Sequence, residues 1–270
     1  MTASSGLTTR ILPPFRFGRR AGRVIERNVM NYRRTWIVLV SGFFEPLFYL
    51  LGIGIGLGGL IGGVPGPDGR PLPYAVFVAP GLLATSAMNG AIYDSTFNVF
   101  FKLRYAKTYD AMLSTPLTIA DVAVGEVTWA LVRGSLYATG FLAVMLVLGL
   151  ARSPLVLLTL PGAVLIGFGF AACGMAATTF MRSWRDFDLI FVVTLPLFLF
   201  SSTFYPITTY PEPLRTFVEL TPLYHGAELL RSVSIGDVGP GLLVHVAYLA
   251  LMGLLGLAIV ARRLDRLLLK

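Results

Sequence analysis

Charged residues are scarce in this chain. Only 13% of its 270 residues are charged, whereas 55% are hydrophobic. A soluble domain of this size needs more charge to cover its surface, so the composition excludes a water-soluble globular protein. Several apolar runs reach the ~20 residues that a helix needs to cross a ~30 Å hydrocarbon core. The sequence therefore predicts a multi-pass, all-α membrane protein.

Cysteine and histidine are also nearly absent. The single cysteine, Cys173, excludes a disulfide framework and a cysteine-rich metal site. The two histidines, His225 and His245, are far apart in the sequence, so a histidine metal site is not expected. We therefore expect no metal and no cofactor on this chain.

Motifs of catalysis and nucleotide binding are missing as well. The chain has no Gly-Lys dipeptide and hence no GxxxxGK[ST] phosphate loop. It has neither an HExxH nor a GxSxG motif, and two isolated histidines offer little general-base chemistry. We expect the chain not to be an enzyme.

Six apolar runs are present, and each predicts a membrane span. Residues 1–14 precede them as a flexible N-terminus, and residues 263–270 follow them as a basic tail. The whole of 36–262 is expected to form one transmembrane domain. The predicted spans cover residues 36–60, 74–101, 122–150, 154–180, 187–205 and 239–260.

Glycines within the first run are spaced for helix packing. Gly52 and Gly56, and likewise Gly54 and Gly58, form GxxxG pairs that let helix backbones approach closely. A second small-residue patch, residues 167–174, lies in the fourth run. We expect close helix contacts at both places.

The segment before the first span is amphipathic. Between residues 15 and 35, apolar side chains recur at spacings of three and four, and arginines fill the other faces. An arginine-rich helix with one apolar stripe is typical of a helix in the lipid headgroup layer; a solvated arm that serves topology alone is the alternative. The arginines assigned to this arm are Arg16, Arg19, Arg20, Arg23 and Arg27.

Basic residues are distributed unevenly between the two sides of the membrane. If the N-terminus is inside, 17 of the 22 Lys and Arg residues lie on the inner side, four lie outside, and Arg133 lies within a span. This excess predicts that both termini are cytoplasmic. It also accounts for the net charge of +8 without a nucleic-acid partner.

The segment between the fifth and sixth runs is too long for a turn and too polar to span. Pro213 and the pair Thr221-Pro222 each look like a helix start, with proline in the first turn. Arg215 with Glu219, and Glu228 with Arg231, are spaced to pair along such helices. We expect two short helices that dip into or lie on the outer leaflet, an ordinary outer loop being the alternative.

Ionisable residues within the predicted spans need a reason, since each costs roughly 2.5–3.5 kcal/mol near the bilayer centre. Glu126 and Arg133 lie seven residues apart on one helix face, and we expect a structural pairing, either with each other or across helices. For Glu45 a structural and a transport role are equally supported.

A polar island at residues 102–121 separates the second and third runs. Its cations come first, and an apolar stripe at helical spacing follows until Pro116 limits the helix. A basic loop with a small amphipathic helix between two spans is suited to docking a cytoplasmic protein.

The combination of these segments resembles the ABC-2 type permeases, the membrane subunits of ATP-driven exporters. The resemblance is carried by ERNVMNYRRTW before the first span, EPLFYLLGIGIGLG within it, YDAMLSTPLTIADVAVGE after the second span, and residues 182–231. Within this family the chain is most similar to lipo-oligosaccharide (nodulation-factor) and actinobacterial drug-export permeases.

The resemblance implies a partner and a role for each segment. The loop at 105–120 corresponds to a coupling helix that sits in a cleft of an ATPase subunit, and the segment 15–34 corresponds to a connecting helix. Two permease copies, a homodimer being favoured over a heterodimer, would work with two ATPase subunits that hold ATP and Mg²⁺, in the cell membrane of a bacterium and among its lipids. The residues expected to couple to the ATPase are Tyr105, Tyr109, Asp110, Met112, Leu113 and Leu117.

The function that follows is export of a lipid-linked, oligosaccharide-bearing or hydrophobic drug-like substrate. An ion-coupled secondary transporter is the first alternative, and a membrane scaffold without transport is the second. Secondary transporters often contain inverted repeats, and residues 36–150 show no repeat of residues 154–260, which argues against this alternative. The candidate substrate path consists of Phe43, Phe44, Glu45, Phe48, Tyr49 and Asp94.

Overall fold

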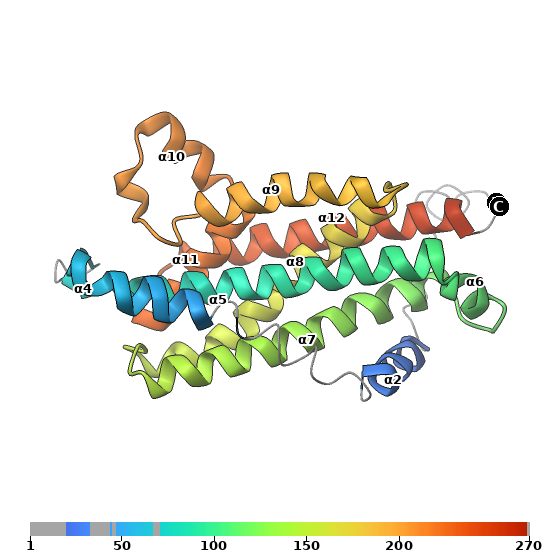
Figure 1. Cartoon of the computed structure of the whole chain (residues 1–270), viewed down its shortest axis with the longest axis horizontal. Helices are drawn as coiled ribbons and strands as arrows, with labels where there is room; N and C mark the ends of the chain where they lie inside the picture. Colours follow the sequence, from blue (N-terminus) through green and yellow to red (C-terminus); the bar gives the residue numbers. More distant parts are fainter. Residues whose placement is uncertain (1–19, 33–43, 45–46, 67–70, 269–270) are drawn as a thin grey trace, which may run out of the picture.

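The computed structural model of the chain describes residues 20–32, 44, 47–66 and 71–268. Long helices lie side by side along the longest axis of the molecule (Figure 1). The C-terminus and the short helices α2 (Ala21–Tyr32) and α6 (Thr108–Leu113) lie at one end, and α4 (Gly58–Ile61) and α10 (Glu212–Glu219) lie at the other. The protein is an all-α membrane protein in architecture, as the sequence predicts.

Within the described residues, four of the six predicted spans appear as helices that are long and apolar enough to cross a membrane. The second continues beyond α5 through two π-helical segments, η2 and η3, and the fourth begins with the 3-10 turn η4. Their elements are α5 (Tyr74–Tyr93), η2 (Asp94–Asn98), η3 (Phe101–Tyr105), α7 (Ile119–Val147), η4 (Pro154–Leu158), α8 (Thr159–Thr178) and α12 (Leu242–Leu268).

The first and fifth predicted spans are shorter within the described residues. The first is described as an apolar helix over Leu47–Ile61, which comprises η1 (Leu50–Leu57) and α4. The fifth is α9 (Phe187–Leu199), which follows the 3-10 turn η5 (Trp184–Asp186). A small hairpin that the sequence analysis did not predict, β1 (Gly63–Pro65) with β2 (Pro71–Pro73), joins α4 to α5.

The segment between the fifth and sixth spans forms two short helices, as predicted. The 3-10 turn η6 (Ile207–Thr209) precedes α10, and α11 (Pro222–Ile235) follows it. Both helices carry proline in their first turn, where the missing N–H leaves no hydrogen bond unmade. The predicted Arg215–Glu219 pair is present at 3.0 Å, and Arg231 pairs with Glu228.

Helix α8 lies at the centre of the bundle and packs against α5, α7 and α12. Glycine makes this packing close: a Cβ at Gly256 of α12 would lie 2.8 Å from the backbone carbon of Ala172, and one at Gly169 would lie 2.8 Å from Met252 Cε. In the first span only one predicted glycine face is packed, because Gly54 and Gly58 lie against the start of α5 whereas nothing approaches Gly52.

Candidate functional site

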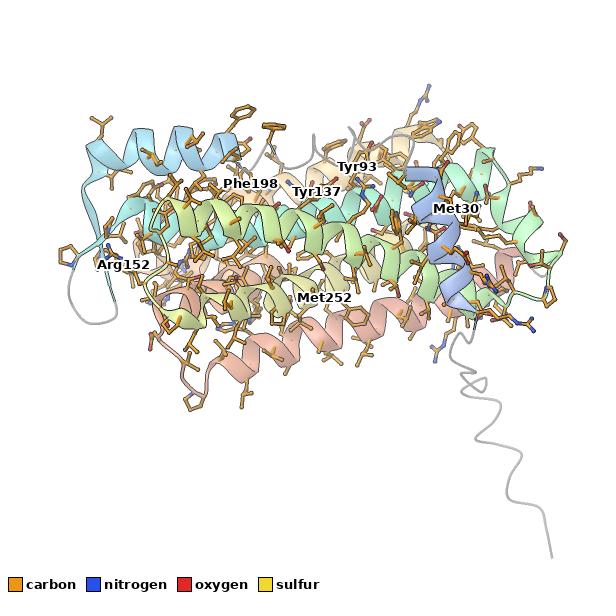
Figure 2. All side chains as sticks on the ribbon, turned by 90° about the horizontal axis from the view of Figure 1, so that it is seen from below. Met30, Tyr93, Tyr137, Arg152, Phe198 and Met252 are labelled. Carbon is orange, nitrogen blue, oxygen red and sulfur yellow. The ribbon has the colours of Figure 1, made fainter. Side chains whose placement is uncertain are left out.

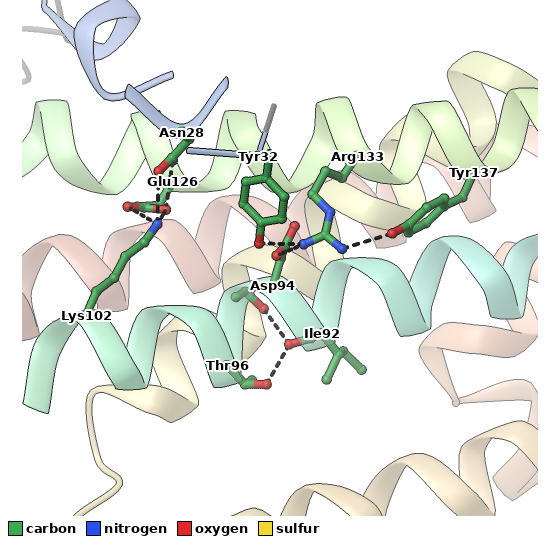
Figure 3. A network of polar contacts seen from close by, with 10 residues as sticks. Asn28, Tyr32, Ile92, Asp94, Thr96, Lys102, Glu126, Arg133 and Tyr137 are labelled. Atoms are coloured by element: carbon green, nitrogen blue, oxygen red, sulfur yellow. Dashed lines mark hydrogen bonds and ion pairs between the residues drawn. The ribbon is translucent and has the colours of Figure 1, made fainter. Parts of the chain in front are cut away.

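Two buried ion pairs connect the N-terminal arm with the second and third spans (Figure 3). In the first pair, Lys102 Nζ lies 2.8 Å from both carboxylate oxygens of Glu126, and these side chains are 8% and 2% exposed. Asn28 of α2 bridges them: its amide nitrogen donates to Glu126 at 3.2 Å, and its oxygen accepts from Lys102 at 3.1 Å. The buried cation and anion therefore neutralise each other and share one amide.

The second pair lies two helical turns further along α7. Arg133 forms an ion pair with Asp94 at the start of η2, and the two side chains are 6% and 2% exposed. The Arg133 guanidinium also donates to the hydroxyls of Tyr32 and Tyr137, each at 2.9 Å, and lies 4.8 Å above the Tyr32 ring. Tyr32 thus ties the end of α2 to this pair.

These contacts settle the geometry that the sequence left open. Glu126 and Arg133 do not pair with each other; each pairs with a residue on the helix that continues α5. A buried charge without a partner is costly, so both pairs fix the register of α5 against α7. Asp94, assigned to the candidate substrate path, is 3% exposed and holds Arg133.

The arm packs on α7 through a small-residue contact. Val24 is 1% exposed, and a Cβ at Gly125 would lie 2.6 Å from its Cβ, so only glycine admits α2 at this depth. Arg20 donates its backbone N–H to Asp121 and its guanidinium to the carbonyl of Pro116. Figures 1 and 2 show α2 crossing the long helices rather than running along them.

The remaining arm arginines lie elsewhere. Arg23 and Arg27 are exposed, and Arg23 pairs with Glu26 at 2.9 Å. Arg16 and Arg19 lie outside the described residues, as do residues 1–19 in general. The described part of the arm therefore combines an apolar and amide face toward α7 with a basic outer face.

The loop assigned to coupling forms α6. The side chains predicted to lie in its apolar stripe are divided between the core and the surface. Tyr109 is fully buried and Met112 is 8% exposed, so these two side chains pack within the chain itself. Burial, with the nearby Glu126 carboxylate, raises the pKa of the Tyr109 phenol well above its usual value. Tyr105 and Asp110 are exposed, and Leu113 and Leu117 are half-buried.

The other candidate path residues lie at the first span. Phe44 and Phe48 stack with ring centroids 5.9 Å apart, and Phe48 is 65% exposed. The Tyr49 ring meets Phe198 of α9 edge-on at 5.4 Å. Phe43 and Glu45 lie outside the described residues.

A histidine pair was missed by the sequence analysis. Although His225 and His245 are far apart in the sequence, α11 and α12 bring their Nδ1 atoms to 2.7 Å, and the His225 ring stacks on Tyr248 at 4.0 Å. No local signal marks this contact, because the two helices meet only in the folded chain. Within the part of the chain that the structure describes, no third His, Cys, Asp or Glu completes a group that could hold a metal.

Arg231 makes more contacts than the sequence analysis predicted. Beyond its predicted pairing with Glu228, it is 5% exposed, donates to the carbonyls of Phe77 and Ser202, and lies 4.0 Å above the Phe77 ring. It therefore fastens α11 to the start of α5 and to the turn after α9.

Comparison with known proteins gives one consistent result. The family model described as "ABC-2 type transporter" matches residues 21–235. Nodulation protein J of Sinorhizobium fredii is 32% identical over 86% of this chain and 87% of its own length, and that of Rhizobium leguminosarum bv. viciae is 32% identical over 90% and 94%. The probable multidrug ABC transporter permease YbhR of Escherichia coli is 24% identical over 62% of this chain and 45% of its own length.

Proposed function

Because the chain belongs to the ABC-2 type transporter family, we propose that it is the permease subunit of an ATP-driven exporter. The observation that carries this proposal is the family match over residues 21–235, which includes helix α2 of the arm, α6 and the two short helices α10 and α11. The buried charges favour it over an ion-coupled transporter, because Lys102–Glu126 and Asp94–Arg133 are held in ion pairs that serve the structure.

The charges at the two ends of the bundle support an orientation in the membrane. Arg20, Lys107 and Arg266 lie on segments near the end that carries α2, α6 and the last turns of α12, where most of the described basic residues gather. We place this end in the cytoplasm, with α10 and α11 on the outer side, in the inner membrane of a bacterium. The helix at residues 47–61 and α9 complete six spans in this arrangement.

The partner would be an ATPase subunit that docks on α6 and holds ATP and Mg²⁺. The docking surface is the exposed side of this segment, with Tyr105, Asp110, Leu113 and Leu117. Tyr109 and Met112 support it from beneath. Two copies of the permease with two ATPase subunits form the assembly, and the permease pair is a homodimer.

The two buried pairs give a mechanical path from α6 into the membrane. Tyr109 is fully buried and lies near Glu126, and Glu126 is bonded to Lys102 and to Asn28 of the arm. A displacement of α6 would therefore move α2, the end of the second span and α7 together. Packed elements that move as rigid bodies are the ordinary means by which such a push is transmitted.

The substrate class is taken from the relatives and from the apolar surface. The resemblance to lipo-oligosaccharide and drug-export permeases, and a relative named as a probable multidrug permease, support an amphipathic cargo. We propose a lipid-linked oligosaccharide or a hydrophobic drug-like molecule, which enters from the cytoplasm or inner leaflet and leaves outward.

The test is co-purification of the tagged full chain from native membranes, followed by mass spectrometry of the intact complex. We expect two copies of this chain with two copies of a phosphate-loop ATPase. Leu113→Asp should weaken ATPase binding and abolish ATP-dependent transport, whereas Leu60→Asp, a control on a leucine that is 85% exposed at the other end, should leave ATPase binding intact. A chain that purifies without any ATPase would refute the proposal.

A further inference from the structure

A cavity of about 950 Å³ lies between α9 and the rest of the bundle. Its walls come from α5, η2, α8, η5, α9, α11 and α12, and its lining is predominantly apolar, with Phe170, Leu189, Val193 and Met252 among the residues. The volume falls within the range of sites for small amphipathic molecules. Among the residues that the structure describes, none of those assigned to the candidate substrate path or to the ion pairs lines this cavity.

The charged residues of the described lining, Arg182 and Asp186, lie at one end of this cavity, and the hydroxyl-bearing residues Thr96 and Thr194 also line it. Arg182, Ser183 and Asp186 line the end nearest η5, which is cytoplasmic in the proposed orientation. The backbone N–H groups of Arg182 and Ser183 donate to the Asp186 carboxylate at 2.6 and 3.1 Å, and these bonds lower its pKa. Asp186 therefore stays ionised, and the end of the cavity carries both signs of charge.

The length of the cavity matches one leaflet of a bilayer. Asp186 at the charged end and Leu197 further along α9 both line it. They are separated by eleven positions along η5 and α9, which at ~1.5 Å per residue corresponds to roughly 16 Å. Half of a ~30 Å hydrocarbon core has about the same thickness.

The wall formed by α9 is also accessible from outside the bundle. Leu189 and Val193 line the cavity and yet are 67% and 59% exposed, and Phe187 is the buried residue of α9. Protein interiors pack densely, so we expect an apolar space of this size to be filled by apolar groups of molecules that can reach it. In a bilayer the available apolar groups are alkyl chains. Because the lipid tails are as apolar as the lining, a lipid gains little from leaving the bilayer for the cavity by apolar contact alone. Its affinity for the cavity therefore depends on the fit of its shape and on its contacts with the charged end.

We propose that this cavity binds the long alkyl chain of an amphipathic lipid, with its polar head at Arg182, Ser183 and Asp186. The orientation of the ligand rests on the proposed function, which places η5 in the cytoplasm. Helix α9 forms one wall, so a lipid from the inner leaflet enters by passing beside it. This site lies within one permease and requires no second copy.

The test uses the purified full-length protein in nanodiscs and a lipid that carries a photoactivatable diazirine near the end of its alkyl chain. After irradiation and digestion, labelled peptides are mapped by mass spectrometry. We expect labels on residues 170–177 of α8 together with 189–197 of α9. Labelling by a phosphatidylglycerol probe would identify a membrane lipid as the occupant, and labelling by an alkyl maltoside probe would identify a lipid-linked sugar; both support the site.

Two neighbouring valines supply matched variants. Val193 lines the cavity, whereas Val192 does not, and they are 59% and 67% exposed. Val193→Trp should abolish labelling of α8 because the indole fills the space, and Val192→Trp should leave it unchanged. Ala177→Phe, which fills the cavity from α8, gives a second filling variant should Val193→Trp fold poorly.

Labels confined to the outer face of α9, or labels on α8 that survive both filling variants, would overturn the proposal. The measurement needs neither ATP nor an ATPase, so its failure is distinct from failure of the proposed export function. If the chain binds the lipid but never an ATPase, the proposed lipid site is supported and the proposed export function is refuted.

Discussion

Lys102 Nζ lies 2.8 Å from both carboxylate oxygens of Glu126, and both side chains are buried between α2, the continuation of α5, and α7. Removing one member leaves an uncompensated buried charge, which costs about 3–5 kcal/mol. We therefore predict that Glu126→Leu strongly lowers the free energy of unfolding, measured by titrating the protein from mild detergent into a denaturing one.

The double variant Lys102→Met with Glu126→Leu removes both charges and should recover most of that loss. Arg215→Ala is the matched control, because its pair with Glu219 is 39% and 40% exposed and solvent screening leaves such a pair with little effect on stability. Equal losses for Glu126→Leu and Arg215→Ala would contradict the structural role of the buried pair.

The contact between α8 and α12 depends on Gly256. A Cβ there would lie 2.8 Å from the backbone of Ala172 and from that of Cys173, atoms that cannot move aside separately. Gly256→Val should therefore destabilise the protein by about 1–3 kcal/mol. Gly59→Ala, where nothing lies within 4 Å, should change stability by roughly 0.5 kcal/mol or less. A thermal shift assay in detergent compares the two variants.

The arm should detach when Gly125 is enlarged. Gly125→Val places a Cβ 2.6 Å from Val24 Cβ, so α2 must move away from α7. We expect hydrogen exchange of the α2 amides to accelerate, because the helix loses the packing that protects them. Gly134→Ala on the same helix, with nothing within 4 Å, is the control; unchanged exchange in Gly125→Val would show that α2 is not held by this contact.

The histidine pair is expected to stabilise the protein without a metal. His245→Leu removes the hydrogen bond to His225 and should cost roughly 1 kcal/mol, read as a lower unfolding temperature. Because the described residues offer no third ligand, treatment with a chelator should leave the unfolding temperature of the unsubstituted protein unchanged. A lower temperature after chelation, together with a bound metal found by elemental analysis, would contradict this account.

Local features determined a large part of this structure. The length of apolar runs predicted the spans at α5, α7, α8 and α12, because the bilayer imposes its thickness on each helix separately. Proline positions predicted the starts of α10 and α11, and spacing predicted the Arg215–Glu219 pair, since both depend on residues within one helix. Small residues predicted close contact at α8 but not which helix would approach it.

Only the tertiary structure decided which groups meet. Spacing allowed Glu126 to pair with Arg133, yet Lys102 and Asp94 are their partners, and α2 supplies Asn28 and Tyr32. The 3.6-residue periodicity of a helix determines on which face a side chain lies, whereas the neighbour of that face depends on how helices distant in the sequence pack. For the same reason the sequence did not predict that Tyr109 is buried or that the two histidines lie in contact.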